Sequence, residues 1–398
     1  MAGIYIHIPF CKSRCIYCGF YSTTALSLRQ RYVDAVCREM ELRKSDSFKN
    51  LHIDTIYLGG GTPTQLTPQQ LEQLFHYINK VYIGNPWSLA EKDMEITIEC
   101  NPDDVTSDYA AVLSRLPANR ISMGVQTFDD KRLRFLHRRH TAAQVPLAVQ
   151  RLREAGIQNI SIDLMYGFPG ETMGDWQRDI DAALGLNVEH LSAYSLMYEE
   201  GTELYEKMRN GENGEMRNDH YQPIDEELER QMYETLIDRL TAAGFEHYEI
   251  SNFARYCSPL PSPASPLTSF RSRHNSSYWQ DVPYIGLGAA AHSYDGLGRQ
   301  WNVSDITQYM TGIEQGTPVF EREELDDDTR YNDRVTVGLR TCEGLCLDEL
   351  SSRHARYLIE QAGKYIAQGL AEIVDNHLRL TRQGLFVSDM IMTELVWV

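Results

Sequence analysis

Short runs of β-branched and aromatic residues alternate with helix-like segments through the first half of this 398-residue chain. The runs predict strands at Ile4–Ile8, Thr55–Leu58, Glu95–Glu99, Arg120–Gln126, Asn159–Met165 and His190–Leu196. Amphipathic stretches lie between them, as at Leu28–Leu42, Pro68–Tyr82, Ser107–Arg115, Ala142–Ala155 and Met173–Leu186. Because parallel strands are usually joined by crossover helices, the alternation predicts an α/β fold, a partial (β/α)6 barrel of the TIM type. Functional side chains are then expected where the strands end.

The strand–helix pattern loosens after the sixth predicted strand. We expect the barrel to span residues 1–230, a connecting segment to span 231–302, and the remainder, 303–398, to form a mainly helical domain. Near its end, Leu370–Thr381 is typical of a hairpin that turns at Asp375 and Asn376. Helices with a small hairpin resemble a winged-helix module, but no basic recognition helix is evident, so packing is the expected role.

The net charge, the hydropathy and the cysteine content limit the classes of protein to which this chain can belong. A net charge of −18 argues against broad nucleic-acid binding, which needs a basic face, so no nucleic-acid partner is expected. No apolar run reaches the roughly 20 residues that span a bilayer, and the N-terminal run is typical of a strand rather than a secretory signal. We therefore expect a cytoplasmic protein, in which clustered cysteines are more often metal ligands than disulfides.

Three cysteines lie within eight residues directly after the first predicted strand, in the segment Cys11-Lys-Ser-Arg-Cys15-Ile-Tyr-Cys18. Thiolates suit either iron–sulfur clusters or zinc. A structural zinc site takes four ligands, and a fourth would have to come from a distant part of the chain. A four-iron cubane on three cysteines leaves one iron open for a small molecule. The segment therefore predicts a [4Fe–4S] cluster on Cys11, Cys15 and Cys18, with zinc or three unrelated buried cysteines as the alternatives.

The spacing Cys-x3-Cys-x2-Cys after a strand resembles the signature of radical S-adenosylmethionine (SAM) proteins. The surrounding Tyr5-Ile-His-Ile-Pro-Phe-Cys11 is similar to one branch of them, which holds oxygen-independent coproporphyrinogen III dehydrogenase (oxidase) and the HemW-type haem chaperones. The resemblance implies that the open iron binds the amino and carboxylate groups of SAM, and that an electron from a reductant cleaves the sulfonium bond to give a 5′-deoxyadenosyl radical. The protein then binds, orients and shields the cofactor.

A glycine loop, Gly59-Gly60-Gly61-Thr62-Pro63, follows the second predicted strand and exposes backbone groups to a ligand. It matches neither the phosphate-loop nor the dinucleotide fingerprint. Polar side chains at other strand ends each have an ordinary structural alternative, such as capping a turn. The resemblance nevertheless implies a SAM site whose carboxylates receive the ribose hydroxyls and whose arginine faces the SAM carboxylate. Its residues are Tyr5, Tyr17, Gly60, Gly61, Thr62, Glu99, Gln126, Arg138 and Asp163.

Two features bear on the branch within this family. The dehydrogenase branch carries a further cysteine two residues after the third ligand, where this chain has Phe20. The segment His274-Asn-Ser-Ser-Tyr278-Trp279 offers an imidazole for haem iron and aromatic rings for a flat porphyrin. An ordinary turn with a hydrogen-bonded His274 and a core Trp279 is the structural alternative. The string is similar to a His-Asn-x-x-Tyr-Trp motif of the chaperone branch, which implies that His274, Tyr278 and Trp279 bind haem b.

These resemblances imply a haem chaperone that holds haem and a SAM-ligated [4Fe–4S] cluster and passes haem to apo-haemoproteins. Respiratory enzymes, met at the membrane surface, are the expected clients. No catalytic residue is assigned, and coproporphyrinogen oxidase activity is not expected. The alternative is an enzyme, either an oxygen-independent coproporphyrinogen III dehydrogenase or another radical SAM enzyme that modifies a tetrapyrrole. A scaffold that keeps the cluster and SAM only for structure is the third hypothesis.

Overall fold

Six parallel strands form the centre of the protein. The computed structural model describes residues 2–44, 52–84, 94–209, 221–256 and 269–398. The strands are β1 (Ala2–Ile8), β2 (Ile53–Gly60), β3 (Glu95–Cys100), β4 (Arg120–Gln126), β5 (Asn159–Tyr166) and β6 (His190–Ser195). Each pairs in parallel with the next. All six coincide with predicted strands, and the predicted α/β partial barrel is confirmed.

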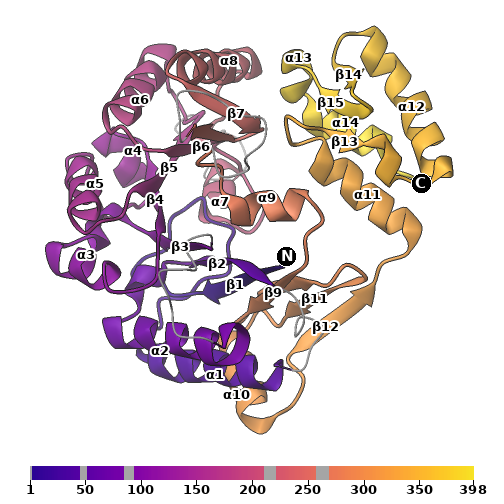
Figure 1. Cartoon of the computed structure of the whole chain (residues 1–398). Helices are drawn as coiled ribbons and strands as arrows, with labels where there is room; N and C mark the ends of the chain where they lie inside the picture. Colours follow the sequence, from indigo (N-terminus) through magenta and orange to yellow (C-terminus); the bar gives the residue numbers. More distant parts are fainter. Residues whose placement is uncertain (1, 45–51, 85–93, 210–220, 257–268) are drawn as a thin grey trace.

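Helices follow each of these strands, and most of them cover the outer face of the sheet (Figure 1). They are α1 (Arg29–Leu42), α2 (Pro68–Ile78), α3 (Ser107–Leu113), α4 (Asp130–Phe135), α5 (Gln144–Glu154), α6 (Met173–Gly185), α7 (Glu203–Arg209) and α8 (Glu226–Ala242). Capping boxes at Thr67 and Thr172 fix the starts of α2 and α6. The short α4 was not predicted; Asp129 begins it by accepting hydrogen bonds from two backbone N–H groups.

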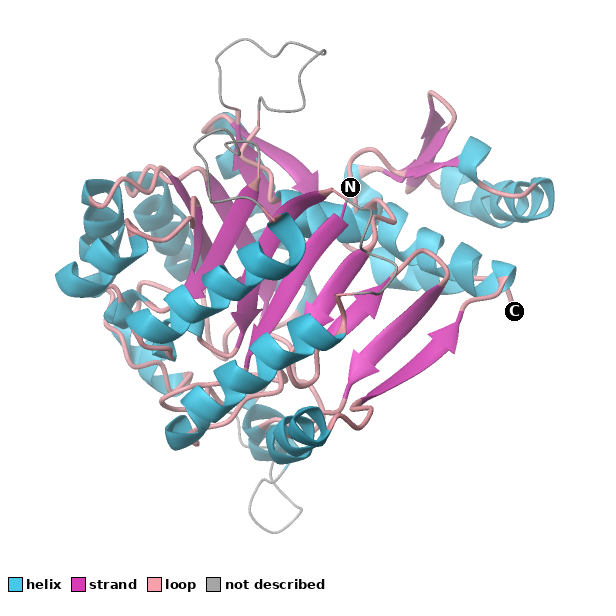
Figure 2. Ribbon diagram, turned by 60° about the horizontal axis from the view of Figure 1, so that its bottom comes forward, coloured by secondary structure: helices cyan, strands magenta, loops and turns pink. Residues whose placement is uncertain are grey.

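Further strands extend the sheet at both edges. On one side lie β9 (Tyr284–Leu287), parallel to β1, and then β10 (His292–Tyr294), β11 (Gly298–Asn302) and β12 (Phe320–Glu324). On the other side lie β8 (Asn252–Arg255) and β7 (Phe245–Glu249). The described strands make a 12-stranded sheet in the order β12-β11-β10-β9-β1-β2-β3-β4-β5-β6-β8-β7. The sheet curves strongly but its order is linear, so the described strands leave the barrel open on one side (Figure 2).

The main hydrophobic core lies between the sheet and its outer helices. In β1, Ile4, Ile6 and Ile8 are fully buried in this core. The core also takes in α10 (Ile306–Gln315) and continues to Val319. The predicted boundary at residue 303 therefore falls inside the first core. A separate core begins at Tyr331.

That separate core belongs to a small C-terminal domain, drawn from orange to yellow at the upper right of Figure 1. Its elements are α11 (Asp327–Gly338), β13 (Leu345–Cys346), α12 (Ser352–Ala367), β14 (Ala371–Val374), β15 (His377–Leu380), α13 (Arg382–Leu385) and α14 (Ser388–Leu395). The hairpin β14–β15 turns at Asp375 and Asn376, whose φ angles are 48° and 62°. Two successive positive φ angles are typical of a tight hairpin turn, so this part of the sequence prediction is confirmed.

No helix among the described residues combines the length and the apolar character needed to cross a bilayer.

Candidate functional site

The loop after β1 carries the three clustered cysteines. Two backbone hydrogen bonds close its base, from Cys11 N to Thr23 O (2.9 Å) and from Thr23 N to Pro9 O (2.7 Å). Ile16 anchors its middle, because its side chain is 1% exposed and packs in a small apolar cluster with Leu136. The remaining side chains of the loop are thereby held over the ends of the barrel strands.

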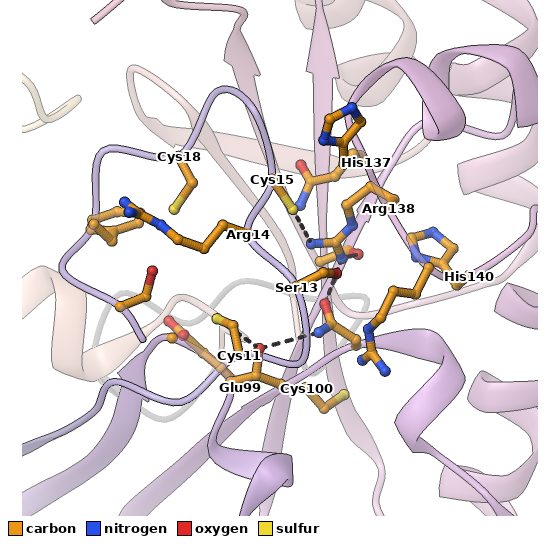
Figure 3. A pocket seen from close by; sticks show the side chains of 18 of the residues that line it. Cys11, Ser13, Arg14, Cys15, Cys18, Glu99, Cys100, His137, Arg138 and His140 are labelled. Atoms are coloured by element: carbon orange, nitrogen blue, oxygen red, sulfur yellow. Dashed lines mark hydrogen bonds between the residues drawn. The ribbon is translucent and has the colours of Figure 1, made fainter. Parts of the chain in front are cut away.

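The three sulfur atoms border one cavity, which we call the cluster pocket (Figure 3). Its volume is about 170 Å³. Eight of the nine residues predicted to bind SAM line it with the cysteines, namely Tyr17, Gly60, Gly61, Thr62, Glu99, Gln126, Arg138 and Asp163. Tyr5 does not line it; this side chain lies deeper in the barrel, against His7 and Tyr57. The strand-end residues therefore gather at one rim, as a barrel requires.

The donor set of the loop fits an iron–sulfur cubane. The side chains of Cys11, Cys15 and Cys18 stand apart from one another around the cluster pocket (Figure 3). In a cubane each thiolate binds a different iron, so the sulfurs stand apart around the cluster. Burial raises the pKa of Cys18 to about 11 and also raises that of Cys11. These thiols need a cationic partner such as iron to ionise at neutral pH.

Arg138, which follows α4, contacts the cysteine loop. Its guanidinium donates to Gly124 O, to Asn101 Oδ1 (2.6 Å) and to Cys15 Sγ (3.7 Å). Asn101 in turn donates to Thr62 Oγ1 (3.2 Å), which links β3 to the glycine loop. Sequence reasoning missed Asn101, although its position directly after β3 was a usable signal. Nε of Arg138 has no acceptor among the described residues, so the guanidinium keeps a charged donor for a ligand carboxylate.

Two carboxylates, those of Glu99 and Asp163, line the cluster pocket together with Arg138. Glu99 accepts hydrogen bonds from Tyr57 Oη (2.8 Å) and Gly60 N (3.1 Å). Burial raises the pKa of Glu99 to about 7 and that of Asp163 to about 6. Buried carboxylates gain most from hydroxyl donors, so both are suited to receive the ribose hydroxyls of SAM.

The glycine loop lies directly against the base of the cysteine loop. Gly61 N donates to Ile8 O (2.9 Å), and Thr62 N donates to Phe10 O (2.9 Å). A Cβ atom on Gly61 would lie 2.7 Å from Pro9 C and 2.8 Å from Ile8 O. Both are backbone atoms, which cannot move aside as a flexible side chain does. Only glycine fits at this position.

We expect Gly61→Ala to weaken SAM binding roughly 10-fold or more, because overpacking of about 1–3 kcal/mol would push the glycine loop away from β1. Titration calorimetry of SAM under anaerobic conditions measures this change. The control is Gly363→Ala in α12, where a new Cβ meets open space. A Gly61→Ala variant with wild-type SAM affinity would show that the two loops do not need this contact.

His274 lies inside the barrel, far from solvent. It is 1% exposed and is the second residue of α9 (Arg273–Trp279). Its Nδ1 is hydrogen-bonded to Thr55 Oγ1 (2.8 Å) and its Nε2 to Tyr278 Oη (2.8 Å). The ring also stacks on Tyr57, with ring centres 5.1 Å apart. Both ring nitrogens are therefore engaged in this conformation.

Burial and the nearby charge of Arg120 lower the pKa of His274 to about 3, against an ordinary value of 6.5. The folded protein keeps this imidazole neutral, whereas the unfolded chain takes up a proton below pH 6.5. Stability is therefore lost as the pH falls below 6.5. When the pH is lowered from about 7.5 to about 5.5, the free energy of unfolding of wild type should fall by about 1.4 kcal/mol more than that of His274→Gln. Urea unfolding of both proteins at the two pH values measures this difference. An unchanged difference between the two proteins would contradict a neutral buried His274.

A second cavity, which we call the interdomain cavity, lies beside the cluster pocket and has a volume of about 670 Å³. One wall comes from the barrel and the cysteine loop, and the other comes from α11 of the C-terminal domain. Its lining includes the aromatic residues Tyr5, Phe20, Tyr21, Tyr278, Trp279, Tyr284 and Tyr294. Phe20 lines both cavities. The structure thus brings Tyr278 and Trp279 of the predicted haem motif to the cavity, while His274 lies behind Tyr278.

Comparisons with known proteins match this geometry. Residues 5–183 match the radical SAM superfamily, and residues 325–387 match the HemN C-terminal domain. The heme chaperone HemW of Bacillus subtilis is 35% identical over 390 residues, which cover 96% of each chain. The heme chaperone HemW of Mycobacterium tuberculosis H37Rv is 31% identical and covers 99% of this chain and 94% of its own.

The chain belongs to the HemW family of radical SAM proteins. As a member of that superfamily, it uses a [4Fe–4S] cluster and SAM as cofactors. Among solved structures, coproporphyrinogen III oxidase (HemN) from Escherichia coli superposes with a TM-score of 0.79. The match covers 99% of this HemW-family chain and 90% of HemN at 21% identity, so the two share their fold. The assignment of single residues to the cluster, to SAM and to haem stays a prediction.

Proposed function

We propose that this protein is a haem chaperone, which binds haem and transfers it to apo-haemoproteins. The observation that carries the proposal is the interdomain cavity, an aromatic-lined space of about 670 Å³ next to the cluster pocket. Pockets of roughly 300–1,000 Å³ enclose ligands of small-molecule size, and flat aromatic ligands favour walls of aromatic side chains. The full-length similarity to chains named heme chaperone HemW supports the same function.

The cluster pocket would serve this function as the cofactor site. Cys11, Cys15 and Cys18 would hold the cluster, and Glu99 and Arg138 would orient SAM. Bound together, the reduced cluster and SAM supply a route to a 5′-deoxyadenosyl radical. Phe20 lines both this pocket and the interdomain cavity. A ligand bound in one cavity can therefore affect a ligand in the other through this side chain.

Phe20 also argues against the dehydrogenase alternative. It stands where that branch of the family carries a further cysteine, and its side chain is 69% exposed. An apolar ring here offers contact area to a porphyrin but no thiol chemistry. We therefore favour a carrier over an enzyme that oxidises coproporphyrinogen.

We further propose that transfer takes place in the cytoplasm and that respiratory enzymes, met at the membrane surface, are clients. The cysteines among the described residues are free thiols, which suits a reducing compartment. A cytoplasmic reductant would supply the electron for the cluster. The net charge of −18 supports the absence of a nucleic-acid partner.

Two anaerobic assays on the reconstituted protein separate the carrier from the enzyme. Titration with haemin should give a Soret band that saturates at about one haem per chain, as one enclosed site requires. Incubation of coproporphyrinogen III with SAM and a reductant should give no protoporphyrinogen. The absence of haem binding, together with SAM-dependent turnover of coproporphyrinogen, would overturn the proposal.

A further inference from the structure

Three histidines lie at or beside the interdomain cavity and are candidates for the axial ligand of a bound haem iron. His7 and His292 line the cavity directly, and His274 lies behind Tyr278. A haem ligand needs a ring nitrogen whose lone pair is free and faces the space where the iron sits. The hydrogen bonds of the three rings decide among them.

Two of these histidines have no free ring nitrogen. His7 is 5% exposed, and its Nε2 lies 2.9 Å from Tyr21 O while its Nδ1 lies 3.0 Å from Tyr5 Oη. His274 uses its two nitrogens on Thr55 and Tyr278. Iron ligation by either would first break hydrogen bonds in a buried part of the barrel, which costs about 1–3 kcal/mol for each group left unsatisfied.

His292 differs from both. It begins β10 and is an exposed residue, so its ring can turn without disturbing the core. Neither of its ring nitrogens has a hydrogen-bond partner within the described parts of the chain. The ring is steadied by stacking on Trp301, with ring centres 6.3 Å apart and an interplanar angle of 29°. Its neutral form, which is the form that binds iron, is favoured by partial burial and by Arg299, which together lower its pKa.

The other side chains of the cavity suit the rest of a haem molecule. Burial raises the pKa of Tyr278 and Tyr284, so these phenols stay neutral and act as flat walls rather than as iron ligands. Their rings meet edge to face, 4.6 Å apart. The indole N–H of Trp279 is shielded from solvent and has no acceptor among the described residues. A porphyrin side chain entering the cavity is a candidate acceptor for it.

Two arginines at the cavity match the carboxylates that a haem carries. Arg299 pairs with Asp333 and with Glu323 (3.8 Å), and Arg334 pairs with Asp281 (3.1 Å). Both guanidinium groups are about one-third exposed, at 38% and 32%. Exposed ion pairs of this kind are weak, so a propionate can exchange with the aspartate at little cost. The cavity thus offers an imidazole, aromatic walls and two exchangeable cations.

We propose that haem occupies the interdomain cavity with a ring nitrogen of His292 as its axial ligand, and that His274 is a positioning residue that holds Tyr278 in the cavity wall. This inference rests on the haem-chaperone function proposed above. His274 belongs to the segment that resembles a haem-binding motif, although both of its ring nitrogens are already hydrogen-bonded. Its effect on haem is therefore indirect and passes through Tyr278.

The test compares His292→Gly, His274→Gln and the control His52→Ala, a surface histidine whose side chain is 80% exposed. Reconstituted full-length proteins are titrated with haemin, and the Soret maximum and the affinity are recorded. His292→Gly should bind haem roughly 10- to 100-fold more weakly, which is the loss seen when a metal site loses a group that holds the metal. Its Soret band should also shift, because the iron loses its axial imidazole. Added imidazole should restore the wild-type spectrum. His274→Gln should bind more weakly but keep the wild-type Soret position, and His52→Ala should match wild type.

The outcomes separate this inference from the proposed function. If wild-type protein binds no haem, the haem-chaperone function itself fails. If wild type binds haem and His292→Gly keeps the same Soret position and affinity, the function stands and the ligand assignment is overturned. If His274→Gln, rather than His292→Gly, shifts the Soret band and responds to imidazole, then His274 is the ligand. Circular dichroism of each variant shows that the fold is retained, and His292→Met gives a second ligand change whose spectrum must differ from wild type.

Discussion

Cys15→Ala protein is expected to hold less than about one iron and one sulfide per chain after anaerobic reconstitution, where wild type holds about four of each. Three thiolates from one loop hold the cubane, and loss of one leaves a second iron without a protein ligand. Cys15 Sγ also accepts a hydrogen bond from Arg138. The substitution therefore also removes the contact between this guanidinium and the cysteine loop. Iron and sulfide analysis, with the absorbance near 400 nm, measures the loss.

The matched control for this variant is Cys346→Ala, which removes a free thiol from the C-terminal domain. It should keep the full iron and sulfide content. Wild-type protein that takes up one zinc and no sulfide, or a Cys15→Ala variant with a full cluster, would contradict the cubane.

Arg138→Met should weaken SAM binding roughly 10- to 100-fold, because hydrogen bonds to a charged group contribute about 1.5–3 kcal/mol. The guanidinium is fixed by Gly124 and Asn101, and its Nε has no acceptor among the described residues, so it keeps a donor for the SAM carboxylate. Calorimetric titration of SAM into the cluster-loaded protein measures the change, provided that the iron content equals that of wild type.

Arg138→Lys is the graded companion of this variant. It keeps the positive charge but loses the planar fork, so its SAM affinity should fall between those of wild type and Arg138→Met. If both variants bind SAM within about twofold of wild type, then Arg138 serves the loop structure and not the carboxylate.

The sequence pattern predicted the barrel, and this barrel brings together most of the residues that the resemblance assigns to a SAM site. Alternating and helical periods mark β1–β6 and their helices because one face of each element must be apolar. Gly60, Glu99 and Gln126 lie close together because they stand at the ends of the parallel strands β2, β3 and β4, which meet at the same rim. Tyr5 lies apart from them because it sits in the middle of β1, below the rim.

Features that depend on long-range packing could not be predicted. Strands β9–β12 are only three to five residues long and give little periodic signal, so the role of His292 at the barrel edge was invisible. The burial of His274 depends on Thr55, which is 219 positions away in the chain. The interdomain cavity arises where α11 meets the barrel, and no local sequence pattern encodes such a contact.

A haem chaperone must give up its bound haem to a client protein. The measurement is stopped-flow absorbance of the haem-loaded, cluster-loaded protein mixed anaerobically with an excess of an apo-haemoprotein. We predict that the client's Soret spectrum develops faster than haem dissociates from the chaperone when a passive haem scavenger replaces the client. A transfer rate equal to the dissociation rate, or haem that stays on the protein, would contradict a chaperone.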